Sequence, residues 1–334
     1  ALTLYLGFTV FWAIDQQTAL NALIAYAFQA GLFVAIAVYP FSKKDLALLV
    51  GATLIGALAQ SGYGGYLFLH GSQIWESRLY IGSEAVHSID PNAFATALIA
   101  PIMLTLIFFL RAPSVLWKLL SFAALGVMLF AFMASGSRGA AIGLAVAIAF
   151  LVWRPHFRLG MFVSIAAAVI AAAASPLGRR FVEADVMTAN GRMDIWKVGF
   201  ASLSQYWLGG AGIGNFNNAF VQYYFATPHM WLPWDRVAHS IFLQSAVEGG
   251  IAGFALFIVF WYLQFRELAR VPAHHPYADM CIALRAGVLG LLVAGFGLNL
   301  MEYKYTWLLF SLIAVTRTVM GDVKPSGKPR GGFE

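Results

Sequence analysis

The run LGMFVSIAAAVIAAAAS at residues 159–175 is apolar almost throughout and carries no charged side chain. About 20 apolar residues cross the ~30 Å hydrocarbon core of a bilayer as a helix, because a helix satisfies its own backbone hydrogen bonds. A strand of a membrane barrel would alternate apolar and polar residues instead. The stretch therefore predicts a transmembrane helix, and it indicates the class of fold to look for in the rest of the chain.

Similar apolar runs occur along the whole chain. Of the 334 residues, 60% are hydrophobic and 11% are charged, against about 25% charged in a typical soluble domain. We find no internal repeat and no soluble domain. The sequence predicts an all-α, polytopic transmembrane helical bundle, a single integral membrane domain over residues 1–334. The expected spans, about ten in number, lie near 1–14, 19–40, 45–69, 92–110, 114–134, 139–153, 159–175, 238–265, 281–300 and 304–320.

Charge and cysteine content exclude some functions. The net charge of +6 does not indicate nucleic acid, because the basic residues lie mainly in short loops between apolar runs. Cys281 is the only cysteine, which excludes an intramolecular disulfide and a thiolate metal cluster. The chain begins with Ala rather than Met, so we expect an upstream segment to be missing.

Lysines and arginines assign the loops to two sides of a bacterial inner membrane, because cytoplasmic loops carry the excess of positive charge. The cytoplasmic side receives Lys43, Lys44, Arg111, Lys118, Arg154, Arg158, Arg266, Arg270 and the basic tail at 321–334. The periplasmic side then receives the loops around 70–91, 134–138, 176–237 and 300–304. The longest of these, 176–237, is predicted to be a large periplasmic loop that contains amphipathic helices.

Basic residues also occur on the periplasmic side, where topology disfavours them. Each could pair with a nearby carboxylate such as Asp90 or Asp194, and for any one residue that alternative stays open. Taken together, the cations indicate an anionic ligand. They include Arg78, Arg138, Arg180, Arg192, Lys197 and Arg236.

The segment TANGRMDIWKVGFASLSQYW at residues 188–207 predicts an amphipathic helix that starts at capping and turn residues. Arg192 falls in its first turn, where free backbone N–H groups and the guanidinium together would bind a phosphate. The alternative is a surface arginine paired with Asp194. The following LGGAGIGNF at 208–216 has no preceding strand, so it predicts a tight glycine turn rather than a dinucleotide loop.

His239 is expected at the periplasmic end of the eighth span. A neutral imidazole at a wet boundary can accept a hydroxyl proton, although a capping or interface histidine is the plainer interpretation. In the same span, Gln244 and Glu248 share a helical face and are expected to be partners. Asp90 and Asn92 flank Pro91, a good helix start in its own right.

Several short motifs stand in a characteristic order: FWAIDQQTAL at 11–20, an arginine followed by DPNAFA at 90–95, SGSRGA at 135–140, GRMDIWKVGF with WLGGAGIGNF at 191–216, and AHSIFLQSAVEGGIAGF at 238–254. In order, spacing and sidedness they resemble the O-antigen ligase superfamily. That group contains O-antigen ligases, polysaccharide polymerases and bacterial protein O-oligosaccharyltransferases. Its members usually have more spans than are counted here, which again implies missing N-terminal helices.

The resemblance implies a metal-independent, inverting transfer of a glycan from undecaprenyl pyrophosphate, with no cofactor. The family's essential histidine falls on His239, and its two arginines fall on Arg138 and Arg192. Ser240 stands where the family often has Asn after the histidine. From their positions we add Arg78, Asp90, Asn92, Arg180, Lys197 and Arg236 as substrate-binding candidates.

The acceptor is expected to be lipid A-core oligosaccharide, as in an O-antigen ligase. A glycan polymerase or a protein O-oligosaccharyltransferase would use the same three residues, so both stay open. A transporter is the alternative of a different class. It would show repeated halves and ionisable groups at the membrane midplane, whereas the candidate residues here collect on one side.

Overall fold

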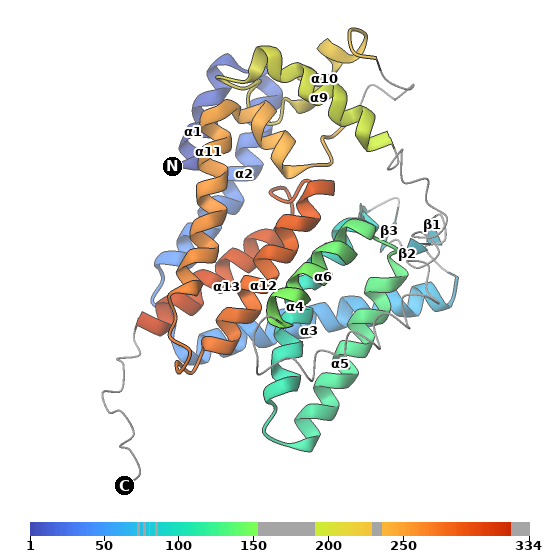
Figure 1. Ribbon diagram of the computed structural model, residues 1–334, viewed down its shortest axis with the longest axis vertical. Coiled ribbons are helices and arrows are strands. Elements are labelled where there is room, and N and C mark those ends of the chain that lie inside the picture. The colour runs from blue at the N-terminus through green and yellow to red at the C-terminus, as the bar shows by residue number, and fades with distance from the viewer. Residues whose placement is uncertain are drawn as a thin grey trace.

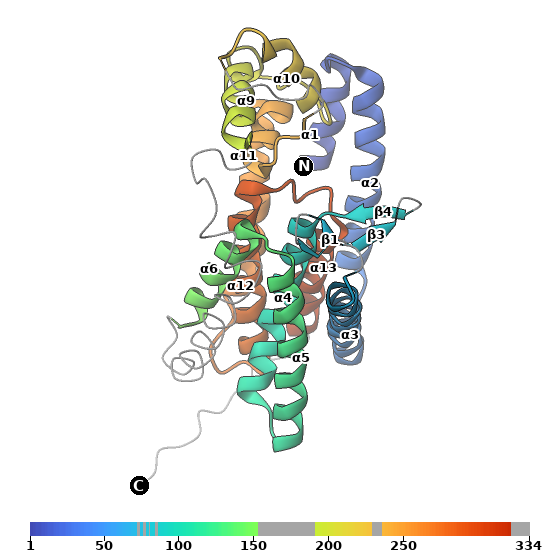
Figure 2. The same cartoon turned by 90° about the vertical axis from the view of Figure 1, so that its right-hand side faces the viewer.

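The computed structural model describes residues 1–71, 74–75, 78–79, 81–83, 86–152, 191–228 and 236–321. In chain order its helices are α1 (Leu2–Thr9), the 3-10 helix η1 (Val10–Trp12), α2 (Gln16–Val38), α3 (Lys43–Leu69), α4 (Pro91–Arg111), α5 (Val115–Ala134), α6 (Arg138–Val152), α9 (Arg192–Tyr206), α10 (Phe216–Tyr224), α11 (Ile241–Ala269), α12 (Ala278–Ala294), the 3-10 helix η4 (Gly295–Gly297) and α13 (Lys304–Gly321). Figures 1 and 2 show an elongated bundle with α9 and α10 at one end.

The helical prediction is confirmed, with one correction. Between α3 and α4 lie two antiparallel pairs of short strands, where only helices and loops were expected. These are β1 (Ile74–Trp75) with β2 (Arg78–Leu79), and β3 (Ile81–Ser83) with β4 (Val86–Ile89). This stretch is rich in β-branched residues, which favour a pleated backbone over a helix.

Six helices of the described chain are long and apolar enough to cross a membrane: α2, α3, α4, α5, α11 and α12 with η4. They match six of the predicted spans. The helices at 1–12 and 138–151 are apolar but shorter, α13 is not among the six, and the span predicted at 159–175 lies outside the described residues. In Figure 1, α3 lies across the long axis of the bundle; length and composition do not determine the tilt of a span.

Helix α4 forms the centre of the bundle. Most of its best spanning window is buried, 78%, against 6% for α2, so α2 presents its apolar surface to the surroundings as a lipid-facing helix does. Asp90 begins α4 as predicted, with Oδ1 accepting the N–H groups of Asn92 (2.7 Å) and Ala93 (3.1 Å). The helix packs against α5, α6 and α12, which fixes Asp90 at one end of the core.

Helix α11 is not the single continuous span expected at 238–265. Gly250 has φ 59° and ψ −165°, which breaks the helix after Gly249. The break frees carbonyl groups that the glycine loop satisfies, because the N–H of Ala211 donates to Val247 (2.8 Å) and that of Gly212 to Glu248 (3.0 Å). A side chain at Gly210 would collide with the Glu248 carbonyl. The predicted tight glycine turn therefore braces the broken helix.

Candidate active site

His239 lies in the bend that leads into α11, and its backbone is strained. It is the only residue other than glycine with a positive φ, 44°, in the described chain, a conformation that costs a non-glycine residue free energy and is typical of functional sites. Two contacts hold it. Trp196 Nε1 donates to the carbonyl of Ala238 (3.1 Å), and Ser240 Oγ accepts the N–H of Leu243 (3.4 Å) to cap α11.

Charges from other segments surround the imidazole. Burial lowers the pKa of His239 from its usual 6.5 to about 4; Arg192 and Arg236 act in the same direction, and Asp90 opposes them. The effect of Arg192 exceeds that of Asp90, so the field at His239 is positive. The histidine is therefore neutral at pH 7, the state in which it can accept a proton.

Arg192 reaches this position from the start of α9, as the sequence predicts. Gly191 precedes it with φ 75°. Its Nη1 lies close to Gly297, where an added Cβ would be 2.8 Å away. Asp194, the alternative partner named from the sequence, accepts a hydrogen bond from Lys197 Nζ through Oδ1 at 2.7 Å.

Asp90 and Tyr303 extend the charged cluster. Burial raises the pKa of the Tyr303 hydroxyl to about 12, and the neighbouring carboxylates Asp90 and Glu302 act in the same direction. Asp90 thus combines two roles: it caps α4 and contributes negative charge beside His239. The sequence did not single out Tyr303, because only folding brings the segment after α12 to the start of α4.

The other predicted residues fall into three groups. Arg236, whose backbone N–H donates to Asn217 (2.9 Å), belongs to the charge cluster. Arg138 begins α6 beside the end of α12, since Gly139 lies next to the carbonyl of Ala294. Within the described residues, its charge is not among those that shift the pKa of His239. Asn92 is in the first turn of α4, and Lys197 pairs with Asp194.

Two further candidates are less defined. The backbone of Arg78 lies in β2, and Arg180 lies outside the described residues. The roles of both stay predictions.

The early FWAIDQQTAL motif also reaches this end of the molecule. Asp15 and Asn215 are joined by two hydrogen bonds, from the Asp15 N–H to Asn215 Oδ1 (2.9 Å) and from Asn215 Nδ2 to the Asp15 carbonyl (3.1 Å). Thr9 Oγ1 accepts the N–H of Ile213 at 3.1 Å. The motif is therefore a structural partner of the glycine loop, which in turn braces α11.

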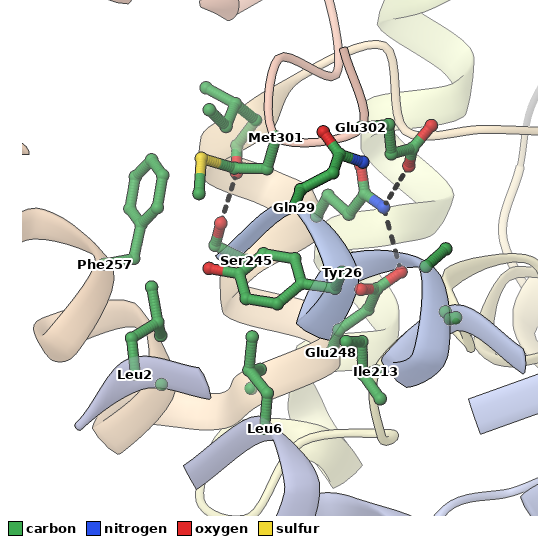
Figure 3. Close-up of a pocket in the computed structure, with 17 residues that line it drawn as sticks. Leu2, Leu6, Tyr26, Gln29, Ile213, Ser245, Glu248, Phe257, Met301 and Glu302 are labelled. Carbon is green, nitrogen blue, oxygen red and sulfur yellow. Dashed lines mark hydrogen bonds between the residues drawn. The ribbon is translucent and has the colours of Figure 1, made fainter. Parts of the chain in front are cut away.

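A cavity of about 280 Å³ lies between α1, α2 and α11 and reaches Met301 and Glu302. Figure 3 shows Glu248 and Glu302 on one side of it and Leu2 and Phe257 on the other. As the sequence predicted, Gln244 and Glu248 are partners, with Gln244 Nε2 donating to Glu248 Oε1 at 3.1 Å. The cavity had no sequence signal, because its walls come from five separate segments of the chain.

A family model described as O-Antigen ligase matches residues 123–258. The matched segment begins in α5, contains Arg138, Arg192 and His239, and ends after the break in α11. With the six apolar helices, it defines a multi-pass membrane protein of glycosyltransferase type. The match supports the O-antigen ligase superfamily and so confirms the resemblance seen in the sequence. No curated protein matches the chain.

Proposed function

We propose that this protein is an O-antigen ligase that moves a glycan from undecaprenyl pyrophosphate to a hydroxyl group of lipid A-core oligosaccharide. The observation that carries the proposal is the convergence of His239, Arg192, Arg236 and Asp90 at one end of the bundle, from three separate parts of the chain. A neutral base within a positive field suits a reaction that deprotonates an alcohol and releases an anion.

The proposed step forms one bond and breaks one. His239 accepts the proton of the acceptor hydroxyl while its oxygen attacks the anomeric carbon of the donor sugar. The bond from that carbon to the pyrophosphate oxygen breaks, and undecaprenyl pyrophosphate leaves with the bonding electrons. Attack opposite to the leaving group inverts the anomeric configuration.

The arginines would act on the leaving group. Arg192 and Arg138 would bind the pyrophosphate and stabilise the charge that grows on it as the bond breaks, the role that family membership implies for both. Arg236, beside His239, would contribute to the same field. Because the bound anion would offset these cations, the pKa of His239 would rise toward neutrality once the donor is in place, which makes it a stronger base.

Metal independence is part of the proposal. Among the described residues no group of three or more His, Cys, Asp or Glu side chains is placed to hold a metal ion, and the arginines would supply the positive charge instead. The assay that tests this compares transfer with and without EDTA. Activity lost to EDTA and restored by a divalent ion would place the enzyme among metal-dependent transferases.

We further propose about ten spans across the bacterial inner membrane, with the site in the periplasm and residues 176–237 as a large periplasmic loop. The support is the common location of segments predicted on that side, around Asp90, Arg192, His239 and Tyr303. Membrane-impermeant thiol labelling in a Cys281→Ala background should modify Ser204→Cys and not Ser326→Cys. The reverse pattern would overturn the topology.

The acceptor defines the remaining alternatives, a glycan polymerase and a protein O-oligosaccharyltransferase. The decisive experiment uses purified protein, a defined lipid-linked donor, and three acceptors in parallel: lipid A-core, a second lipid-linked glycan and a serine-containing peptide. Transfer to lipid A-core alone supports the ligase. Transfer to one of the others selects that function, and uptake of substrate into vesicles without any new glycosidic bond would favour a transporter.

A further inference from the structure

In the cavity between α1, α2 and α11, two carboxylates share one donor side chain. Gln244 Nε2 donates to both Glu248 Oε1 (3.1 Å) and Glu302 Oε1 (3.0 Å), which occupies its two N–H groups. Ser245 Oγ donates to the Ile241 carbonyl at 2.7 Å. Glu248 and Glu302 form a polar wall of the cavity, and their carboxylate oxygens can accept hydrogen bonds from a ligand.

A third acceptor faces the same space. The Oε1 atom of Gln29, which lines the cavity from α2, is buried and has no hydrogen-bond partner within the described structure. Buried polar atoms in proteins are nearly always hydrogen-bonded, so one without a partner calls for an explanation. A ligand that donates hydrogen bonds provides one.

The opposite wall is apolar. Leu2, Leu6 and Phe257 line it, and the ring of Tyr26 lies between the two walls (Figure 3). A bare divalent cation favours oxygen ligands all around it, which this wall does not supply. A hydrocarbon chain would leave Gln29 Oε1 without a hydrogen-bond donor. A sugar ring has hydroxyl donors around its edge and C–H groups on its faces, and it matches both walls.

The location ties this cavity to the charge cluster. Glu302 directly precedes Tyr303, whose hydroxyl lies in the field of Asp90, and Gln244 lies in the first half of the helix that follows His239. The volume of about 280 Å³ is near the lower end of the ~300–1,000 Å³ typical of small-molecule sites. We infer that the cavity binds one sugar unit of a substrate glycan, with Glu248, Glu302 and Gln29 accepting its hydroxyl hydrogens. This inference rests on the proposed transferase function.

The test variants are chosen according to the contacts that each cavity residue makes with the rest of the fold. Glu302 is exposed and contacts Gln244, so Glu302→Leu should fold. Gln29→Leu removes the unpartnered oxygen and keeps the size of the side chain. Glu248 is a poor choice, because its carboxylate also accepts the backbone N–H of Phe216 at 3.3 Å and so supports the fold. Glu267→Gln is the matched control, since Glu267 pairs with Arg270 at the far end of α11.

The test measures binding apart from transfer. Full-length protein in lipid nanodiscs is titrated with methyl glycosides of glucose, galactose and N-acetylglucosamine, followed by saturation-transfer NMR. At least one glycoside should bind, with affinity lowered at least about tenfold in Glu302→Leu and Gln29→Leu and unchanged in Glu267→Gln. In transfer assays the same two variants should raise KM for one substrate, and whether that is the lipid-linked donor or the acceptor identifies the source of the sugar.

Three outcomes would overturn the inference: no glycoside binds the native protein; binding is the same in both cavity variants; or Ca²⁺ or Mg²⁺ binds and is lost in Glu302→Leu, which would make the cavity a metal site. Failure of the proposed function appears differently. If glycosides bind in the cavity but the native protein forms no glycosidic bond with any donor, the transferase proposal fails and the sugar site stands.

Discussion

The two ends of the helix bundle use their cations in different ways. At the end where α4 finishes and α12 begins, Arg111 Nε lies 2.8 Å from Asp279 Oδ2, and Arg270 pairs with Glu267 at 3.2 Å. Arg285 lies over the rings of Phe150 and Phe265, 5.1 and 4.4 Å from their centroids. Each of these charges meets a defined local partner.

At the other end, Lys197 pairs locally with Asp194, but two arginines act on a common target. Arg192 comes from α9 and Arg236 from the loop before α11, and both lower the pKa of His239. A cation that pairs with a neighbouring group stabilises the fold, and the pair has little electrostatic effect on more distant residues. Cations gathered around one imidazole instead produce a positive electrostatic potential at that imidazole. These two sets of basic residues, indistinguishable by type, therefore serve structure at one end and are suited to chemistry at the other.

The contrast between the two ends is tested most strongly by replacing one histidine at each end. His239→Ala should lower the rate of glycan transfer about 10²–10⁴-fold, the usual contribution of a general base. His275→Ala, in the turn before α12 where His275 Nδ1 accepts the N–H of Tyr277, should leave transfer unchanged. Purified variants assayed with the same donor and acceptor would check this. Equal rates in the native protein and His239→Ala would remove His239 as the base.

A second test removes one arginine from each end. Arg192→Ala should lower kcat about 10²–10³-fold if its charge stabilises the departing pyrophosphate, and Arg192→Lys should recover only part, since lysine lacks the planar fork. Arg270→Ala should change activity little, because an exposed ion pair contributes at most about 1 kcal/mol. Steady-state kinetics with matched expression levels give the answer. Similar losses at both positions would mean that the contrast between the ends is wrong.

A milder change tests the strained backbone. Trp196→Phe keeps an aromatic ring but removes the hydrogen bond to the Ala238 carbonyl that holds the bend at His239. A hydrogen bond contributes about 0.5–1.5 kcal/mol, so kcat should fall about two- to tenfold, with KM nearly constant. A rise in KM alone would show that Trp196 contributes to binding and not to placement of the base.

The smallest effect concerns pH. Because the pKa of His239 is about 4 in the free protein, kcat/KM should stay level from pH 8 down to about 5 and halve near pH 4, rather than near the usual 6.5. The kcat profile, which reports the bound complex, should fall at higher pH, since bound pyrophosphate raises the pKa. Coincident profiles with a midpoint near 6.5 would contradict the positive field.

The same shift has a consequence for stability. An unfolded chain takes up a proton at this histidine below about pH 6.5, whereas the folded protein does so only near pH 4. The fold therefore loses the stability associated with neutral His239 as the pH falls through that window. Urea or thermal unfolding of native protein and His239→Ala between pH 7 and 5 should show a smaller decline in the variant.

The class of protein follows from the sequence alone. Continuous apolar runs predict spanning helices because lipid supplies no backbone partners, and six helices long and apolar enough to cross a membrane are present in the described residues. Local signals also predicted local structure correctly: Asp90 and Pro91 start α4, Arg192 starts α9, and Gln244 contacts Glu248. Each of these depends on residues within a few positions of one another.

How these segments act together depends on the long-range contacts of the fold. The break at Gly250 is stabilised by the N–H groups of Ala211 and Gly212, which donate to carbonyl groups of α11. These donors lie far from Gly250 in the sequence, so no local pattern predicts the break. The contact between Trp196 and Ala238, the field of Arg192 at His239, and the cavity that α1, α2 and α11 share are likewise long-range. Such features arise from side chains that folding brings into contact, and the spacing of residues along the chain does not predict them.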